Sequence, residues 1–490
     1  MPVAVSSPIA SVPSGSAKGA YSTTPHKKDP YEYQVGLGNV FQSEAIPGTL
    51  PDAQNSPQKN KYGLYAEGIT GSSFIAPRSE SMQTWTYRIQ PSVAHQGFTR
   101  LPDNPDLESC FLNLNKRVHV SPTQLAWYPF DLPEDHTRTD FVDGLKTLAG
   151  NGDPTLREGL AIHMYLANAS MDRKAFVNND GDMLILPQQG RLDIFTEFGK
   201  MMVRPGELCV IQRGIKFKVR LPDGPSRGYI QEIFGSHYSL PELGPLGTHG
   251  LANRRDFEHP VAAFEVDQND WEIVYKVAGE LHSCSQDHTP FDVVAWHGTY
   301  LPYKYAMEKF TYVGSISKDH IDPSVFCVLT AKSKQPGVPL ADFLIFGGRW
   351  DVSDNTFRPP YYHRNSATEF MGLIYGPYGG RSDGFQPGGA SFENGFCPHG
   401  VSYEEFKKAT EADLAPTRVH DGTLAVMFET SMMLTITDYA MTRSGKLHEH
   451  EPKMWDNLRA NFLDHLDELN LNTKPAENTG RNKRSRVEAE

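Results

Sequence analysis

The chain has 490 residues, of which 39% are hydrophobic and 22% are charged, and its formal net charge is −12. This length suffices for two core-forming units, and the acidic balance argues against nucleic acid as the main partner, because phosphate binding needs a basic surface. No apolar run approaches the ~18 residues of a membrane-spanning helix, so we expect a soluble protein without a membrane partner.

The N-terminal segment, residues 1–28, is rich in serine, alanine and proline and contains lysine but neither acidic residues nor arginine. This composition faintly resembles an organelle transit peptide, which would be arginine-rich and amphipathic. Because arginine and a clear amphipathic period are lacking, we expect residues 1–28 to form a disordered tail.

Short apolar segments follow, separated by glycine and proline at brief intervals, which is typical of a β protein. RLDIFTEFG (191–199) alternates like a half-buried strand, and GELCVIQRGIKFKV (206–219) predicts a hairpin around Gly214. We therefore predict a mainly β fold, in which these apolar side chains form the core.

The five cysteines, at positions 110, 209, 284, 327 and 397, form no CxxC pair. Their odd number and wide spacing argue against a disulfide framework and fit a reducing compartment. We expect a cytoplasmic protein.

The most informative motif is the set His363, Glu369 and His399, in PPYYHRNSATEFMGLIYG and the later CPHG. Two imidazoles and one carboxylate are the ligands of the facial triad, which holds Fe(II) and leaves sites for substrate and dioxygen. Glu369 follows His363 by six residues, so on one strand both would project from the same face, and His399 could return on a neighbouring strand. An ordinary His–Glu pair is the alternative, and the same ligands suit zinc. The pattern resembles the two motifs of a cupin.

Near the end, apolar residues recur at three- and four-residue steps in MWDNLRANFLDHLDEL (454–469) and predict a helix that docks on the body. HEHE at 448–451 looks like a second metal motif, but we expect it to be solvated. Residues 446–490 are thus predicted to form a C-terminal helix and a charged tail.

Read along its length, the chain resembles the homogentisate 1,2-dioxygenase family from about Tyr33 to about Trp455. The resemblance rests on GLGNVFQSEAIPGTLPDAQNSPQ and KYGLYAEGITGSSFIAPRS near the start, and on FDVVAWHGTYLPYKYAMEKF, DHIDPSVFCVLTAKS and RWDVSDNTFRPPYYHRN later. It implies a large N-terminal β domain over residues 30–308 and a C-terminal cupin-like jelly roll over residues 309–445, with a few helices. It also implies a homo-oligomer, a hexamer as in the family.

The resemblance also implies an activity, the Fe(II)-dependent, extradiol-type opening of homogentisate by O2 to maleylacetoacetate in tyrosine and phenylalanine catabolism. It places the iron ligands at His363, Glu369 and His399 and the catalytic base at His320 in DHIDPS. Tyr378 and His399 would contact the substrate. His297 in AWHG rivals His320 as the base, but we expect it to be a core histidine.

Departures from the family pattern bear on the substrate. Glu393 stands where the family commonly has histidine, and an anion there would oppose a carboxylate-bearing substrate if it points inward. Arg381, after the flexible Gly379 and Gly380, could supply a replacement positive charge. The alternatives are therefore a diverged paralogue that cleaves another hydroquinone-type ring and a non-catalytic cupin-like binding protein. The aromatic segment YLPYKYAMEKF (300–310), if exposed, could serve subunit contacts.

Overall fold

The computed structural model describes residues 29–52, 57–242, 251–313, 323–378, 385–448 and 452–472. One compact unit extends to His450, and a second begins at Glu451. No helix of the described residues is long and apolar enough to cross a membrane.

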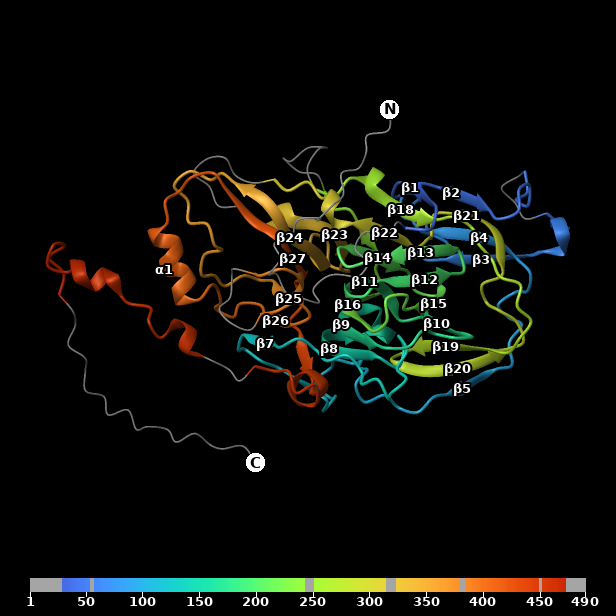
Figure 1. The fold of residues 1–490 in the computed structure, drawn as a ribbon, viewed down its shortest axis with the longest axis horizontal. Helices are drawn as coiled ribbons and strands as arrows, with labels where there is room; N and C mark the ends of the chain where they lie inside the picture. The colour runs from blue at the N-terminus through green and yellow to red at the C-terminus, as the bar shows by residue number, and fades with distance from the viewer. Residues whose placement is uncertain are drawn as a thin grey trace. The chain divides into compact units, whose positions relative to one another are not determined.

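The largest layer of the first unit is a ten-stranded sheet with the order β1-β18-β22-β14-β11-β16-β9-β8-β28-β6 (Figure 1). Its strands are β1 (Tyr33–Val35), β18 (Phe257–Pro260), β22 (Tyr303–Ala306), β14 (Glu207–Ile211), β11 (Gly181–Gln189), β16 (Ser226–Phe234), β9 (Glu158–Ala167), β8 (Leu145–Asp153), β28 (Thr435–Thr437) and β6 (Val118–His119). The mainly β fold predicted from the sequence is confirmed.

Two more sheets come from the first two thirds of the chain. A seven-stranded sheet contains β13 (Gly199–Val203), β12 (Leu192–Thr196), β15 (Lys216–Arg220), β10 (Lys174–Asn178), β19 (Trp271–Val277), β20 (Glu280–Gln286) and β5 (Phe98–Arg100) in that order. A four-stranded sheet contains β2 (Phe41–Glu44), β21 (Val293–Gly298), β4 (Gln83–Arg88) and β3 (Tyr65–Thr70). The strand predicted in RLDIFTEFG is β12.

The predicted hairpin around Gly214 is wrong. The flanking strands β14 and β15 both exist, but β14 pairs with β11 and β22, whereas β15 pairs with β10 and β12. The turn at Gly214, which has a φ of +81°, therefore carries the chain from one sheet to another. Both strands are largely buried. Each therefore lies between two strands of its own sheet and does not pair with its neighbour in sequence.

The site sheet is the second seven-stranded sheet, with the order β17-β23-β24-β27-β25-β26-β7. Its strands are β17 (Tyr238–Ser239), β23 (Cys327–Lys332), β24 (Pro339–Asp351), β27 (Thr417–Thr430), β25 (Thr368–Tyr375), β26 (Ala390–Glu393) and β7 (Leu125–Trp127). Early strands β7 and β17 join this sheet, while the late strand β28 joins the ten-stranded one. The two predicted domains therefore exchange strands, and the boundary at 308/309 remains a prediction.

Alternation along β25 gives the site sheet two different faces. Phe370 and Ile374 belong to a core cluster that includes Tyr229 of β16. Tyr229 donates a hydrogen bond from its hydroxyl to the carbonyl of Gly389 at 2.6 Å. Gly372 is needed here, because a Cβ would lie 2.9 Å from the Tyr229 ring. One face of the site sheet thus packs on the ten-stranded sheet, and the other is left for a cavity.

The helical elements are short. Among the described residues, the α-helix is α1 (Tyr403–Glu411), whose first turn is capped by the Ser402 side chain accepting from the Glu405 amide. A π-helix spans Tyr439–Arg443. Single 3-10 turns lie at Lys61–Gly63, Pro154–Leu156, Arg254–Asp256, Met307–Lys309, Pro323–Phe326, Pro452–Trp455 and Asn461–His465. The sequence analysis missed α1, although Ser402 and Glu405 have the spacing of a capping box.

Two predictions about exposed or helical segments are wrong. Residues 454–469 form no continuous helix but only the turns ending at Trp455 and His465. The segment contains five asparagine and aspartate residues, whose side chains can compete for backbone hydrogen bonds and so lower helix propensity. The segment 300–310 is not an exposed contact surface, because Tyr300, Tyr305 and Met307 are buried in the core. Apolar periodicity alone showed neither that residues 300–310 are buried nor that Leu458, Phe462 and Leu463 are exposed.

Candidate metal centre

The structure brings His363, Glu369 and His399 together, with one donor atom from each lying within 4.8 Å of the others. Glu369 is the second residue of β25, whereas His363 precedes this strand and His399 follows β26. The expectation that His363 and Glu369 share one strand is therefore wrong. Instead, His363 and His399 face each other in an isolated antiparallel bridge, and each backbone N–H donates to the other's carbonyl at 3.1 Å.

Both imidazoles are oriented in the same way. Nδ1 of His363 lies 2.6 Å from the carbonyl oxygen of Tyr361, and Nδ1 of His399 lies 2.9 Å from that of Cys397. A carbonyl can only accept, so each Nδ1 carries the hydrogen and each Nε2 keeps its lone pair. The two Nε2 atoms lie 3.6 Å and 3.5 Å from the same oxygen, Glu369 Oε1. This is the arrangement by which backbone partners fix metal-binding histidines.

The donor set fits a divalent first-row metal. Bonds of about 2.1 Å at 90–109° around an ion separate neighbouring ligand atoms by about 3.0–3.4 Å, close to the spacing found here. Asn365 Nδ2 donates to Glu369 Oε1 at 2.8 Å and orients the carboxylate. His399 Nε2 is buried and has no hydrogen-bond partner among the described residues. A buried ring nitrogen of this kind is expected where a metal binds.

The charges of the three ligands are complementary. Burial alone would raise the pKa of Glu369, but the adjacent imidazoles of His363 and His399 hold that pKa well below its ordinary value. The adjacent Glu369 carboxylate raises the pKa of His363. Burial lowers the pKa of His399, but the same carboxylate raises it, so that it lies above its ordinary value. The cluster thus favours positive charge between its members, as a cation site does.

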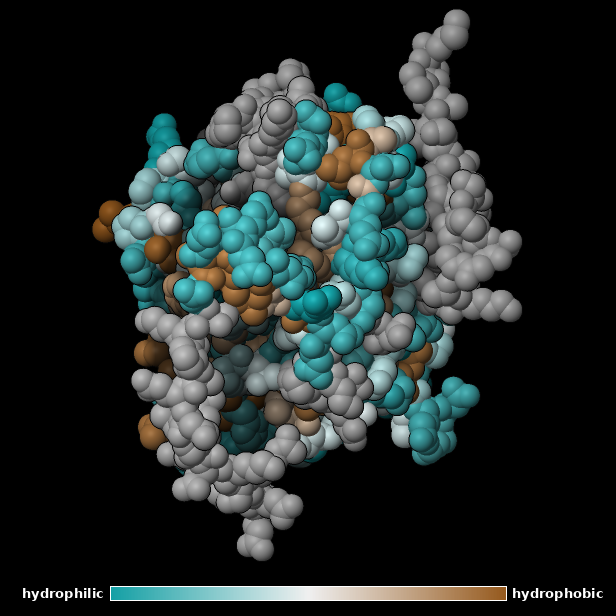
Figure 2. Space-filling model, turned by 90° about the vertical axis from the view of Figure 1, so that its left-hand side faces the viewer, coloured by the Kyte–Doolittle hydropathy of each residue, from teal (hydrophilic) through white to brown (hydrophobic). Residues whose placement is uncertain are grey.

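A cavity of about 1740 Å³ lies on the face of the site sheet that points away from the core. It is lined by all three ligands and by apolar residues of the sheet, among them Leu344, Met371 and Met427. Figure 2, which views the side at the left of Figure 1, shows hydrophobic side chains recessed between hydrophilic ones. A metal at the cluster would therefore be reached from a cavity large enough for a small aromatic ring.

An acidic row crosses this wall of the cavity. Glu369 is the register partner of Glu393 on β26 and of Glu429 on β27, and Glu429 is in turn the partner of Asp342 on β24. Partners in antiparallel strands project from the same face, so four carboxylates lie side by side. Burial raises the pKa of Asp342. Sequence reasoning missed Asp342 and Glu429, because their neighbours lie on strands distant in sequence.

The remaining predicted site residues have different outcomes. His320 and Arg381 lie outside the described residues. Tyr378 lines the same cavity and contacts Phe385 and His420 through its ring. Tyr378 follows the end of β25 at Tyr375. Tyr375 is six residues after Glu369, which corresponds to roughly 20 Å along an extended strand. Its contact with the substrate therefore remains a prediction.

His297 does not belong to the ligand cluster. It is half-buried in β21, stacks on Tyr87 with ring centroids 6.1 Å apart, and has a pKa lowered by burial. In HEHE, His448 packs against the Tyr128 ring, while residues 449–451 lie outside the described residues. Among the described residues, the metal-type group is His363, Glu369 and His399.

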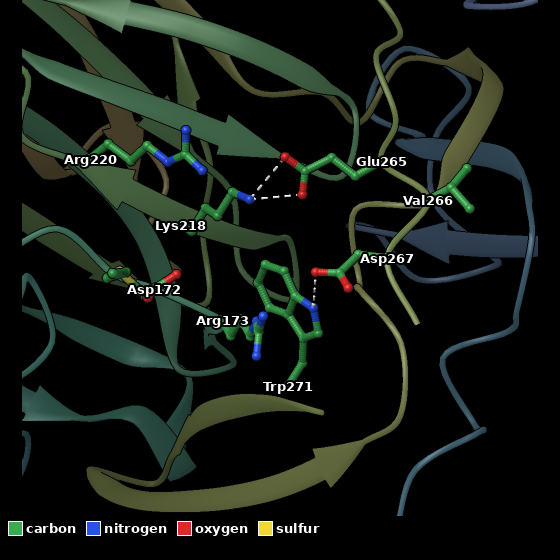
Figure 3. Close-up of a pocket in the computed structure, with 9 residues that line it drawn as sticks. Asp172, Arg173, Lys218, Arg220, Glu265, Val266, Asp267 and Trp271 are labelled. Carbon is green, nitrogen blue, oxygen red and sulfur yellow. Dashed lines mark hydrogen bonds and ion pairs between the residues drawn. The ribbon is translucent and has the colours of Figure 1, made fainter. Parts of the chain in front are cut away.

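A second cavity, of about 380 Å³, is lined by side chains from residues 171–271 (Figure 3). Lys218 donates to both oxygens of Glu265 at 2.8 Å and 3.1 Å, and its ammonium lies 4.8 Å from the Trp271 ring. Asp267 accepts from the indole N–H of Trp271 at 3.1 Å. Lys218, Glu265, Asp267 and Trp271 are thus paired with one another.

The comparisons with known proteins agree with the geometry. The family model described as "Homogentisate 1,2-dioxygenase N-terminal" matches residues 32–307, and the corresponding C-terminal model matches residues 308–462. Homogentisate 1,2-dioxygenase from Dictyostelium discoideum is 51% identical over 88% of this chain and 98% of its own length, and the enzyme from Homo sapiens is 48% identical over 88% and 97%. A cupin 2 conserved barrel domain protein from Leptotrichia buccalis, 7% identical over 63% of this chain and 89% of its own, has a TM-score of only 0.23, which is too low to support an argument. The sequence matches show that the chain belongs to the homogentisate 1,2-dioxygenase family.

Proposed function

We propose that this protein opens the ring of homogentisate with O2 to give maleylacetoacetate, with Fe(II) held by His363, Glu369 and His399. The observation that carries the proposal is the pair of Nδ1-tethered imidazoles whose Nε2 atoms converge on one carboxylate oxygen. Two histidines and one carboxylate with open positions are the ligand set of non-haem Fe(II) oxygenases. Zinc would accept the same donors, so the metal must be tested.

The protein groups would have distinct tasks. When bound, ferrous iron supplies coordination positions for a ring hydroxyl and for dioxygen, together with a route for electron density between them. Glu369 balances part of the metal charge, and the apolar side chains Leu344, Met371 and Met427 exclude water from the ring. His320 would accept the proton of a ring hydroxyl on an imidazole nitrogen, which is typically worth about 100- to 10,000-fold in rate. Tyr378 would contact the bound ring.

The test uses the full chain purified without air. Metal analysis is expected to find iron, and an oxygen electrode is expected to record oxygen uptake when homogentisate is added to the Fe(II)-loaded protein. Glu404→Gln, a change on the exposed side of α1, serves as the control that keeps the activity. Activity supported by zinc, without oxygen uptake on homogentisate, would refute the proposal.

One observation favours a second candidate. Glu393 lines the cavity beside Glu369, which meets the condition under which it would oppose a carboxylate-bearing substrate. A diverged paralogue acting on another hydroquinone-type ring is therefore the alternative. Oxygen uptake with gentisate and hydroquinone, compared with homogentisate, distinguishes the two. A non-catalytic binding protein has less support, because the ligand cluster is intact.

We also propose a homo-oligomer, a hexamer by family resemblance, in the cytoplasm. The cytoplasmic assignment is supported by five cysteines that are all free. The oligomer is supported only by the resemblance, since residues 300–310 are too buried to form the contact. Light scattering of the purified protein measures the oligomeric state, and a monomeric mass would contradict this part of the proposal.

A further inference from the structure

Two buried polar side chains, Thr368 and Asn394, lie directly behind the metal ligands. Thr368 begins β25 and is followed by the ligand Glu369, while Asn394 follows the last residue of β26. Successive side chains of a strand point to opposite faces. Because Glu369 lines the cavity, Thr368 points to the core side of the sheet, where it meets Asn394. The two residues are 0% and 5% exposed.

The side-chain amide of Asn394 joins three segments of the chain. Its Oδ1 accepts from the Thr368 hydroxyl at 3.0 Å and from the backbone N–H groups of Gly395 and Leu434, both at 3.2 Å. Its Nδ2 donates to the Leu434 carbonyl at 3.3 Å. A backbone N–H can only donate and a carbonyl can only accept, so these partners fix one orientation of the amide. The Thr368 hydroxyl also accepts from the Gly395 N–H at 3.1 Å.

The backbone of Asn394 extends this network to the ligand His399. The Asn394 carbonyl accepts from the Cys397 N–H at 3.1 Å and thereby closes a tight turn. The Cys397 carbonyl is the group that faces Nδ1 of His399 at 2.9 Å. Within the turn, Phe396 has a φ of +61°, a left-handed conformation that is uncommon for residues other than glycine. Such a conformation persists only where its surroundings hold it, so the turn depends on its anchors.

The network also ties the ligand segments to the core. Leu434 is 1% exposed and directly precedes β28, which pairs with β8 in the ten-stranded sheet. The bonds between Asn394 and Leu434 therefore fix the start of the His399 turn relative to that sheet. The bond to Thr368 does the same for the strand that carries Glu369. Both ligands are thus positioned against one buried reference point.

We propose that Asn394 and Thr368 are positioning residues that set the separation of His399 and Glu369. This inference rests on the metal site of the proposed function and deepens it. Outer partners of metal ligands are typically worth 10- to 100-fold in metal affinity. We expect the lower limit, about 10-fold, for either residue, because the Phe396 N–H still donates to the Asn365 carbonyl at 2.7 Å and anchors the turn a second time.

The test uses Co(II), which binds the same donors and has a visible absorption spectrum that depends on its coordination geometry. The metal-free full chain is titrated with Co(II) as wild type, Thr368→Val, Asn394→Ala and the double variant. Each single variant should bind Co(II) about 10-fold more weakly and show a changed spectrum. The double variant should also lose only about 10-fold, because both changes break the same link and independent effects alone would multiply to roughly 100-fold. Thr368→Ser, which keeps the hydroxyl, should restore the wild-type affinity.

Thr84→Val is the matched control for a loss of stability without an effect on the site. Thr84 on β4 is 1% exposed, and its hydroxyl donates to the Tyr300 carbonyl at 2.9 Å and accepts from the Tyr300 N–H at 3.0 Å. This threonine therefore makes the same two kinds of bond as Thr368, but in the four-stranded sheet. In urea, Thr84→Val should be destabilised as Thr368→Val is, yet keep the wild-type Co(II) affinity and spectrum.

The results separate this inference from the proposed function. Wild-type Co(II) affinity and spectrum in Thr368→Val and Asn394→Ala would overturn the inference, and so would losses that multiply in the double variant. If one single variant does not fold, the other decides. A wild type that binds Co(II) but, loaded with Fe(II), takes up no oxygen with homogentisate would refute the proposed function and leave the positioning role intact. A wild type that binds no Co(II) would overturn both.

Discussion

The orientation of Glu369 by Asn365 leads to a quantitative prediction. Asn365 Nδ2 donates to Glu369 Oε1 at 2.8 Å, the same oxygen that both imidazoles face. Asn365→Ala keeps all three ligands but releases this carboxylate. Removing a group that orients a metal ligand typically lowers metal affinity 10- to 100-fold, which corresponds to about 1.4–2.7 kcal/mol. Asn365→Leu, which also lacks the donor, should lower the affinity to a similar extent.

The assay is a competition titration of the purified apoprotein against a chromophoric chelator, with Fe(II) under nitrogen. Asn179→Ala removes an exposed asparagine side chain from the first half of the chain and is the matched control. An affinity of Asn365→Ala equal to that of the wild type would refute the reasoning. So would an Asn365→Leu variant that binds the metal as tightly as the wild type, because the donor would then not matter.

Three further predictions concern the ligand cluster and the buried charges. Glu369→Gln should lose iron and activity together, since it removes the anionic ligand, and an unchanged kcat would reject this role. Lys276→Met should reduce the free energy of unfolding by about 3–5 kcal/mol in urea titrations, because it leaves Glu232 and Asp180, both 2.8 Å from the ammonium, buried without it. Burial would raise the pKa of Glu232, but Lys276 and His163 lower that pKa from 4.5 to about 2. The ionised carboxylate of Glu232 therefore stabilises the fold above about pH 4.5, and this stabilisation is lost as the pH falls toward 2. Urea unfolding midpoints that stay constant between about pH 4.5 and 2 would contradict this role of Glu232.

Much of the fold class could be predicted from local sequence. Alternating apolar residues between glycine and proline indicated strands, and β12 lies where that pattern predicted it. The pairing of strands could not be predicted in this way. β14 and β15 are neighbours in sequence but belong to different sheets, because each buries its apolar side chains against strands from elsewhere in the chain. Alternation specifies the conformation of a strand but not its partner.

The helical elements show the same limit. The apolar spacing of residues 454–469 predicted a helix that the structure does not contain, and α1 was overlooked despite its serine cap. A short amphipathic segment gains most of its stability from tertiary packing, so its periodicity is weak evidence by itself. The burial of residues 300–310 was likewise invisible in sequence, because it depends on the sheet that β22 joins.

The sequence by itself determined which groups could bind a metal, because two histidines and a glutamate supply these donors in any arrangement. Only the tertiary structure decided how they are presented. The bridge between His363 and His399 and the carbonyls of Tyr361 and Cys397 direct both Nε2 atoms at one carboxylate. The pairing of β24, β27, β25 and β26 places further carboxylates beside that one. Such proximity depends on hydrogen bonds between strands far apart in the chain, and no local pattern of residues specifies these.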